Sequence, residues 1–256
     1  MRYDIKLKKG KDLENLRESC KRLARVLDET EKMIKPGITT KDIDDFVYKK
    51  ITEGGDKSAF LDYQPFGAAY AYPGNICISV NNEVVHGIAG GRVLQEGDIV
   101  GIDGGINHKG MISDSARTVA VGKISDENKK LLEVTKASLF AGIKAAKCGA
   151  YVNDISKAIE KSIPKKYGIV KILSGHGVGY KVHEEPYVPN FDDGIKGPKL
   201  VPGMVLALEP MVNIGTDDVI LEDDGYTFTT ADHKNSAHFE HTILITEGEA
   251  EILTRS

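Results

Sequence analysis

The spacing of apolar residues predicts two helices at the start of the chain. Between positions 13 and 34 apolar residues recur three and four positions apart, which is the period of an amphipathic helix, and Lys-Pro-Gly at 35–37 ends it. A second helix is expected to begin near Thr39 or Thr40, because threonine is a favoured helix cap, and to run to about position 51.

Apolar and β-branched runs then predict strands, and the same order of helices and strands returns. The first strands are expected at 76–80, 98–106 and 111–121. Helices follow at about 126–147 and 152–163, and strands at 169–174, 204–210 and 238–246. The polar stretches between Pro186 and Pro202 and between Asp217 and Asn235 are expected to be connections.

The repeated order suggests an internal duplication. Segment 94–103 lies over segment 200–209, and in this register Asp103 coincides with Glu209, so that both halves place a carboxylate at the same point of the same strand. No linker separates the halves. We therefore predict an α+β fold in one domain, residues 1–256, with pseudo-symmetric halves at about 1–122 and 123–256.

Composition narrows the class of protein. A net charge of −4 gives no strong electrostatic attraction to DNA or to an anionic membrane. No stretch approaches the roughly 20 apolar residues of a membrane span, and the first residues lack the apolar run of a signal peptide. The three cysteines are odd in number and far apart, which argues against a disulfide framework. A cytoplasmic protein is expected.

Two aspartates in the first set of strands suggest a cation site. A two-residue loop at His108-Lys109 would pair Asp103 directly with Asp114 across a hairpin. Directly opposed residues have Cβ atoms about 4.5–5.5 Å apart, so two carboxylates there would repel each other. A metal ion between them is favoured over a solvated sheet face, because the surrounding residues are apolar or glycine.

Further candidate ligands lie in the second half. Glu209 ends the apolar run MVLAL, Glu240 sits inside AHFEHTILIT, and His176 stands between two glycines in SGHGVGYKVHEEP. A carboxylate in so apolar a run is either salt-bridged or bound to a metal. Oxygen ligands with one imidazole suit two divalent ions such as Mn, Fe, Co or Zn. Such a pair can stabilise a tetrahedral intermediate in peptide hydrolysis.

The glycines of this segment also allow another interpretation. Gly175-x-Gly177-x-Gly179 could form a phosphate-binding loop, but its spacing differs from the dinucleotide-binding fingerprint. We expect the glycines instead to let the backbone pass close to a metal centre and a substrate.

Five segments together resemble the type I methionine aminopeptidases. They are SVNNEVVHGI (79–88), GIDGGINHKGMISDSARTV (101–119), SGHGVGYKVHEEP (174–186), ALEPMV (207–212) and FEHTILIT (239–246). The resemblance runs from the first helix to the last strand. It implies a pita-bread fold, in which pseudo-twofold duplicated helices pack on a curved antiparallel sheet.

The resemblance also implies the ligands of two divalent metal ions. Asp103 would hold one ion, His176 and Glu209 would hold the other, and Asp114 and Glu240 would bridge both. A hydroxide bound by both metals would attack the carbonyl that follows the N-terminal methionine. The choice between cobalt, manganese, iron and zinc stays open.

The same resemblance implies catalytic roles. Glu209 would shuttle the proton, His183 would stabilise the tetrahedral intermediate, and His86 would lie by the scissile amide nitrogen. The methionine pocket would contain Tyr63, Tyr72, Cys77 and Tyr226 as substrate-binding residues, together with His86 and His183.

Three features depart from the family pattern. Val182 stands where an aromatic residue is usual before the second histidine, and Tyr226 replaces a usual tryptophan. Segment 60–77 looks several residues longer than its counterpart.

The other histidines have plainer interpretations. His108 is expected to be solvated at a hairpin tip, and His233 is expected to be exposed in a polar connection. His238 would share the face of Glu240, whereas His241 would point the other way and support the sheet.

The resemblance implies an enzyme that removes the initiator methionine from nascent polypeptides. A monomer is expected, and transient contact with the ribosome is compatible with this role. Two alternatives stay open: an aminopeptidase or dipeptidase of the same fold that cleaves next to proline, and a non-catalytic relative that binds ribosomes or RNA.

Overall fold

The computed structural model describes residues 3–255 and contains four α-helices in this part of the chain. They are α1 (Gly10–Met33), α2 (Thr40–Glu53), α3 (Asp126–Ala145) and α4 (Val152–Ser162). All four predicted helices are confirmed. None of those in the described part combines the length and the apolar character that crossing a membrane requires.

Capping residues fix where two of these helices begin. At α2 the Thr39 hydroxyl accepts a hydrogen bond from the Asp42 amide at 3.0 Å, and the Asp42 carboxylate accepts one from the Thr39 amide at 2.8 Å. This reciprocal capping box satisfies two amides that the helix leaves unpaired. At α3 the Ser125 hydroxyl accepts from the Asn128 amide at 3.1 Å. Each cap stabilises its helix by about 1 kcal/mol.

The described residues also contain fifteen strands. They are β1 (Lys57–Ser58), β2 (Ile76–Val80), β3 (Glu83–Val85), β4 (Ile99–His108), β5 (Met111–Ala120), β6 (Gly168–Ile169), β7 (Ser174–Gly177), β8 (Glu184–Pro189), β9 (Val205–Leu208), β10 (Met211–Asn213), β11 (Val219–Leu221), β12 (Phe228–Thr230), β13 (Ser236–His238), β14 (His241–Leu244) and β15 (Glu251–Ile252).

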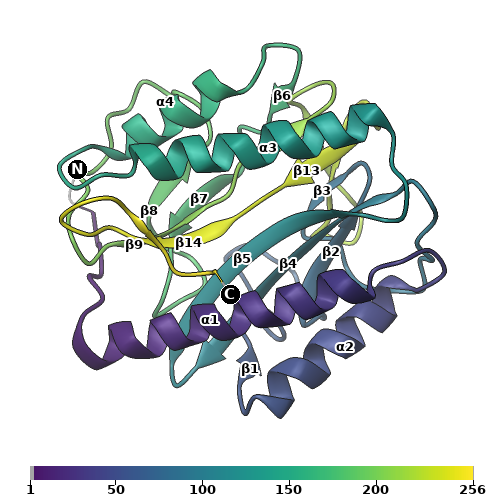
Figure 1. The fold of residues 1–256 in the computed structure, drawn as a ribbon, viewed down its shortest axis with the longest axis horizontal. Coiled ribbons are helices and arrows are strands. Elements are labelled where there is room, and N and C mark those ends of the chain that lie inside the picture. The colour runs from purple at the N-terminus through teal and green to yellow at the C-terminus, as the bar shows by residue number, and fades with distance from the viewer. Residues whose placement is uncertain (1–2, 256) are drawn as a thin grey trace.

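The two halves of the chain meet along β5. In the first half β4 pairs antiparallel with β1, β2 and β5, and in the second half a sheet runs in the order β15-β14-β9-β7-β8. The Thr118 hydroxyl donates to the His238 carbonyl at 2.9 Å, and the Thr242 hydroxyl donates to the Asp114 carbonyl at 2.6 Å. These side chains hold β5 beside β13 and β14 at the middle of the molecule (Figure 1).

Each half also has its own apolar core. Figure 1 shows α1 and α2 at one edge of the molecule and α3 and α4 at the opposite edge, with the strands between them. Leu27, Ile43 and Ile102 are buried in the core of the first pair of helices. Leu131 and Ile155 are buried in the core of the second pair. The expected α+β architecture, with paired helices on antiparallel sheets, is confirmed.

Two predicted strands of the second half are interrupted. β13 pairs with β10, whereas β14 pairs with β9, and the register on the two sides of the gap is continuous. Continued through the gap, that register sets Glu209 opposite Glu240. The structure has no strand pairing at these two residues. Pro210 has no amide hydrogen to donate there. The predicted strands at 204–210 and 238–246 therefore break at these two glutamates.

Other strand predictions were wrong in detail. Residues 170–173 belong to no strand, because β6 pairs with β10 while β7 joins β8 and β9, so the chain passes between two sheets. The stretch from Pro186 to Pro202, predicted to be a connection, contains most of β8. The stretch from Asp217 to Asn235 contains the hairpin of β11 and β12, and β12 also pairs with β3. Strands of three residues are too short for alternation to identify them.

The predicted register of the β4–β5 hairpin was wrong by two residues. Asp103 lies opposite Ala116 and Asp114 opposite Gly105, because the turn is Lys109-Gly110. Both turn residues have positive φ, 52° and 84°, as a type I′ turn requires. A shift of two residues keeps both aspartates on one face of the sheet, where they are diagonal neighbours.

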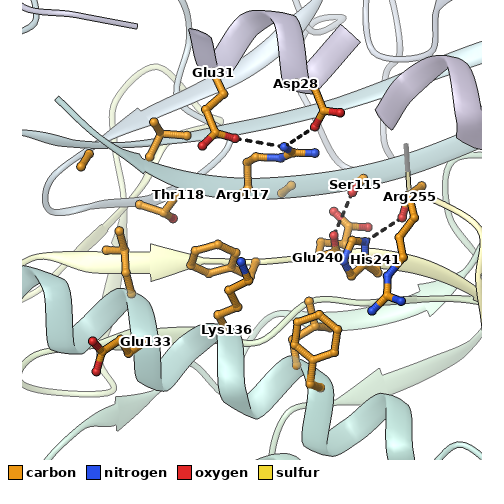
Figure 2. Close-up of a pocket in the computed structure, with 18 residues that line it drawn as sticks. Asp28, Glu31, Ser115, Arg117, Thr118, Glu133, Lys136, Glu240, His241 and Arg255 are labelled. Atoms are coloured by element: carbon orange, nitrogen blue, oxygen red, sulfur yellow. Dashed lines mark hydrogen bonds and ion pairs between the residues drawn. The ribbon is translucent and has the colours of Figure 1, made fainter. Parts of the chain in front are cut away.

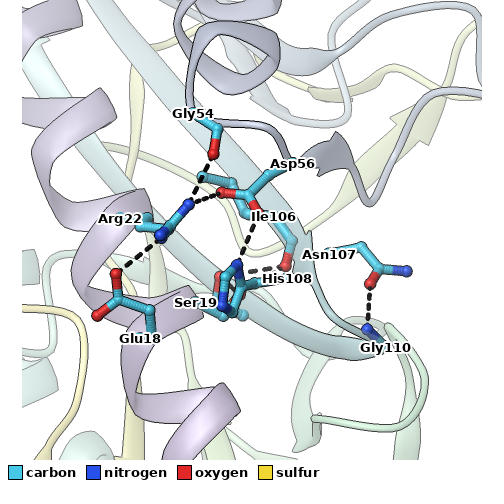
Figure 3. Close-up of polar contacts among 10 residues, drawn as sticks. Glu18, Ser19, Arg22, Gly54, Asp56, Ile106, Asn107, His108 and Gly110 are labelled. Atoms are coloured by element: carbon cyan, nitrogen blue, oxygen red, sulfur yellow. Dashed lines mark hydrogen bonds and ion pairs between the residues drawn. The ribbon is translucent and has the colours of Figure 1, made fainter.

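The expectation of a solvated His108 was also wrong. Its Nδ1 donates to Asp56 Oδ1 at 2.7 Å, and both side chains are buried. Asp56 Oδ2 accepts from Arg22 Nη1 at 3.0 Å, and Arg22 Nε donates to Glu18 Oε1 at 2.8 Å (Figure 3). Helix α1 and the segment that follows α2 therefore cover His108 at the end of β4, whereas the turn residues Lys109 and Gly110 are exposed. His233 is exposed, as expected.

Candidate metal centre

One cavity of about 640 Å³ brings together the predicted site residues from both halves of the chain. Asp103 comes from β4, Asp114 from β5 and His176 from β7. Glu209 directly follows β9, and Glu240 stands between β13 and β14. The predicted residues that line the cavity are Tyr63, Tyr72, Cys77, His86, Asp103, Asp114, His176, His183, Glu209, Tyr226 and Glu240.

His176 is the closest partner of the carboxylates. Its Nε2 lies 3.2 Å from Glu209 Oε1 and 3.9 Å from Asp114 Oδ2. Its Nδ1 lies 2.9 Å from the Gly177 carbonyl, which can only accept a hydrogen bond. Nδ1 therefore carries the proton, and the lone pair of Nε2 points to the carboxylates, as a metal ligand requires. Potential ligand atoms of Asp114, His176 and Glu240 all lie within 4.8 Å of one another.

Three of the four carboxylates in this cavity have an oxygen atom that lacks a hydrogen-bond partner in the described part of the chain. Asp103 Oδ1, Asp114 Oδ1 and Glu240 Oε1 are buried without a hydrogen-bond partner among residues 3–255. Burial raises the pKa of Asp103, Asp114 and Glu240 well above its usual range, and the neighbouring carboxylates raise it further. Unpaired buried charges cost several kcal/mol. This donor set fits divalent cations, which would supply the missing partners.

Hydrogen bonds between the halves hold two of these carboxylates in place. The Ser115 hydroxyl donates to the Glu240 carbonyl at 2.8 Å, and the Glu240 amide donates to the Ala116 carbonyl at 2.8 Å. On the other side of Asp114 its carbonyl accepts from Thr242. The backbones that carry Asp114 and Glu240 are therefore fixed relative to each other.

The glycines around His176 serve the packing of strands. A Cβ added at Gly175 would lie 2.4 Å from the Ala207 carbonyl oxygen, and one added at Gly177 would lie 2.4 Å from the Glu185 carbonyl oxygen. Both distances are shorter than any ordinary contact. The close approach that we expected toward a metal and a substrate is, in the structure, an approach to the neighbouring backbone.

Two more histidines face the same cavity. His183 Nδ1 and the Tyr63 hydroxyl are hydrogen-bonded at 2.8 Å, and the rings of His183 and His176 meet edge to face at 4.5 Å. Although His183 opens to the cavity, partial burial lowers its pKa to about 3, with smaller contributions from His176 and His86. Burial lowers the pKa of His86 to about 4. Both side chains are neutral at pH 7.

His86 has an unusual backbone. Its φ is +61°, in the left-handed region that non-glycine residues rarely adopt. Such a conformation costs about 1–3 kcal/mol and is kept where the surrounding structure demands it, often at functional sites.

An apolar wall lies beside the carboxylates. It consists of Phe60, Tyr72, Cys77, Val182 and Tyr226, which are buried against one another. Val182 is thus part of this wall, and Tyr226 packs edge to face on Tyr72 at 5.2 Å. Sequence reasoning missed Phe60, since nothing in its neighbours marks it as part of a site.

His238 is a further neighbour of the carboxylates. Its Nε2 lies 3.7 Å from Glu209 Oε2 and has no hydrogen-bond partner among residues 3–255. Burial lowers its pKa to about 3. The two-residue spacing from Glu240 had indicated a shared face. His241 instead hydrogen-bonds the Thr254 hydroxyl at 2.8 Å, in agreement with its expected supporting role.

A buried ion pair ties the start of the chain to the segment that carries His183. Lys8 Nζ lies 2.5 Å from Glu184 Oε2, and both side chains are almost fully buried. The Lys8 amide also donates to the Gly203 carbonyl at 2.8 Å. We call residues 3–9 the N-terminal arm. This arm packs directly behind the residue that follows His183.

A second cavity, of about 770 Å³, lies on the helix side of the sheet between α1 and α3. Figure 2 shows Arg117 of β5 pointing to Asp28 and Glu31 of α1, and its Nη1 lies 2.7 and 3.0 Å from their carboxylates. Although this cavity is larger, it contains no cluster of metal-ligand atoms among the described residues. The two cavities share only Glu240 among their lining residues.

Comparisons with known proteins agree with this geometry. Residues 14–247 match the model of metallopeptidase family M24. The chain is 46% identical to methionine aminopeptidase 1 of Bacillus subtilis, over 97% of this chain and 98% of that protein. It is 45% identical to the methionine aminopeptidase of Aquifex aeolicus, with 98% of each chain covered.

Solved structures give the same result. The crystal structure of methionine aminopeptidase from Thermotoga maritima superposes with a TM-score of 0.94 at 38% identity, over 98% of this chain and 100% of that chain. The prolidase of Pyrococcus furiosus, at 22% identity and a TM-score of 0.77, covers 98% of this chain and 65% of that chain and shares the fold alone. With its pita-bread fold, the chain belongs to the methionine aminopeptidases of metallopeptidase family M24.

Proposed function

We propose that this protein is a metal-dependent aminopeptidase that removes the N-terminal methionine from polypeptides. The observation that carries the proposal is the group of buried, unpaired carboxylates around His176, set beside an apolar wall in one cavity. The apolar wall suits a methionine side chain, and the carboxylates suit divalent ions. The names of the relatives support the same substrate.

Five residues would hold two divalent ions. Asp103 would hold one ion, His176 and Glu209 the other, and Asp114 and Glu240 both. When bound, the ions supply a Lewis acid and lower the pKa of water, so that a nucleophile is available at neutral pH. The unpaired oxygen atoms of Asp103, Asp114 and Glu240 support this assignment.

The chain's own residues would handle the proton and the developing charge. Glu209 would shuttle the proton. Its side chain is 14% exposed, whereas those of Asp114 and His176 are each 5% exposed. Neutral His183 would donate a hydrogen bond to the substrate carbonyl oxygen as negative charge develops there. His86 would lie by the scissile amide nitrogen.

Peptide hydrolysis after metal removal tests the proposal. The metal-depleted protein should not cleave Met-Ala-Ser, and added Mn²⁺ or Co²⁺ should restore methionine release. Leu-Ala-Ser should be cleaved far more slowly. A preference for Ala-Pro-Ala would instead favour the proline-specific alternative, and no release from any substrate in the presence of metal would favour the non-catalytic one.

A matched pair of variants tests the site itself. Asp114→Asn should lower kcat/KM for Met-Ala-Ser at least about 100-fold, because it removes a ligand charge from the cavity. Asp223→Asn changes an exposed carboxylate in the connection between β11 and β12 and should leave kcat/KM within twofold. Undiminished turnover by the Asp114 variant would rule out the proposed metal centre.

The substrate also suggests where the protein acts. Initiator methionine is exposed on chains that leave the ribosome, so we propose a cytoplasmic monomer that meets nascent chains there. The net charge of −4 favours a transient contact with ribosomal RNA over a tight one. Co-sedimentation with ribosomes at low and physiological salt would measure this contact.

A further inference from the structure

We infer that an apolar rim at the mouth of the metal cavity binds the third and fourth residues of the polypeptide substrate. The rim consists of Phe66, Ile172 and Tyr187. This inference rests on the proposed function and adds to it a preference for the sequence beyond the scissile bond.

Phe66 stands on a loop that is held by backbone hydrogen bonds at its base and near its tip. At the base the Tyr72 amide donates to the Tyr63 carbonyl at 2.8 Å. Near the tip the Ala68 amide donates to the Pro65 carbonyl at 3.1 Å, which closes a tight turn around Phe66. This loop lies within segment 60–77, which looks several residues longer than its family counterpart.

The C-terminal part of the loop is hydrogen-bonded to the connection between β11 and β12. The Tyr70 hydroxyl donates to the Asp224 carbonyl at 2.6 Å, and the Tyr226 hydroxyl donates to the Tyr70 carbonyl. The rings of Tyr70 and Tyr226 meet edge to face at 5.2 Å. The loop is therefore built onto the wall of the methionine pocket, yet the Phe66 side chain is fully exposed.

Two other exposed apolar residues converge on the same opening. Ile172 is 68% exposed and Tyr187 is 64% exposed, and both line the metal cavity together with Phe66. They come from separate parts of the chain, the segment before β7 and strand β8. Single exposed apolar residues are common on protein surfaces, but three that gather at the mouth of one cavity indicate a binding surface.

The rim is continuous with the cavity, and this indicates that the same polypeptide substrate binds to both. The inner apolar wall takes the methionine side chain, and the second residue lies at the scissile bond near His86. A polypeptide substrate must continue outward from there, at about 3.3–3.6 Å per extended residue. We assign the third and fourth residues to the rim, where their apolar side chains would bury against Phe66.

A pair of pentapeptides tests the inference. We expect kcat/KM for Met-Ala-Phe-Leu-Ser to exceed that for Met-Ala-Ser-Ser-Ser about tenfold in the metal-loaded protein, which corresponds to about 1.4 kcal/mol of transition-state binding. In Phe66→Ser this ratio should fall to about two. Tyr187→Ser should lower it in the same direction.

A matched control separates the rim from exposed apolar surface in general. Ile195 is 65% exposed but does not line the cavity, so Ile195→Ser should keep the ratio at about ten. A wild-type ratio near one, or an unchanged ratio in Phe66→Ser, would overturn the inference. So would a Phe66→Ser variant that changes the sedimentation coefficient but not the ratio, because the rim would then join two copies of the chain. Failure of the proposed function is distinct, since Met-Ala-Ser itself would then not be cleaved.

Discussion

His183 illustrates how one side chain acquires its chemical character from its neighbours. Its ring lies between the Tyr63 hydroxyl and the ring of His176. With a pKa of about 3 it stays neutral through the range in which most enzymes are assayed. A neutral imidazole can offer a hydrogen bond to a substrate oxygen without repelling metal ions.

The first prediction concerns this residue. His183→Gln should lower kcat for Met-Ala-Ser about 10²–10³-fold, the effect of removing one donor from a developing oxyanion. The affinity for Mn²⁺, measured by calorimetry, should stay within twofold. Tyr63→Phe, which removes only the partner of His183, should have a smaller effect on kcat. A loss of metal binding in His183→Gln would show that the residue is a ligand instead.

Single residues were the most predictable part of the site. A carboxylate in an apolar run of the sequence, such as Glu209 or Glu240, is visible because burial of an unpaired charge is so unfavourable. Phe66 was not predictable in this way. Its role depends on exposure at a particular place, and an apolar residue in a loop gives no sign of whether it is covered.

At the scale of elements, the β4–β5 hairpin carries two of the carboxylates and is held in place at His108, next to its turn. The His108–Asp56–Arg22 chain joins the hairpin to α1 and to the segment after α2 (Figure 3). Hydrogen bonds to a buried carboxylate contribute about 1.5–3 kcal/mol each.

The second prediction concerns this contact at His108. His108→Ala should lower the free energy of unfolding by about 2 kcal/mol, because Asp56 loses a buried partner. Lys57→Ala, an exposed change on the neighbouring β1, should stay within about 0.5 kcal/mol. Urea denaturation followed by circular dichroism measures both. Equal stabilities of the two variants would mean that the hairpin tip does not depend on His108.

The ends of helices and strands were predicted correctly where neighbouring residues in the sequence determine them. They were missed where pairing between distant strands determines them. The capping box at Thr39 is readable in the sequence, and α2 begins there. The break at Glu209 and Glu240 depends on which strand each side pairs with, and no local pattern reports that. The hairpin register failed because the turn could equally be placed at His108-Lys109 or at Lys109-Gly110.

For the whole molecule, the site exists only because two half-structures meet. β5 of the first half lies beside β13 and β14 of the second, and each side contributes carboxylates to one cavity. The order of elements had suggested this duplication, and the two apolar cores agree with it. We propose that the halves, which share this one site, form a single domain.

The third prediction links metal binding to the stability of the whole fold. Because burial raises the pKa values of Asp103, Asp114 and Glu240, the folded metal-free protein binds more protons than the unfolded chain. Its stability should therefore fall as the pH rises from about 4 toward the raised pKa values. Metal ions replace these protons.

The increase in Tm on adding Mn²⁺ should accordingly be larger at pH 7.5 than at pH 5, as measured by scanning calorimetry. Asp114→Asn should reduce the increase at both pH values. An equal increase at both pH values in the unmutated protein would contradict the linkage between these carboxylates and the metal.

The N-terminal arm has a practical consequence for handling the enzyme. Lys8 is buried in its ion pair with Glu184, the residue after His183, so a bulky fusion close to this end would compete with a contact behind the metal cavity. Arg255, at the other end, is exposed beside the cavity between α1 and α3. An affinity tag or a surface linkage for immobilised use therefore belongs at the C-terminal end, where it leaves the mouth of the active cavity open to long peptides.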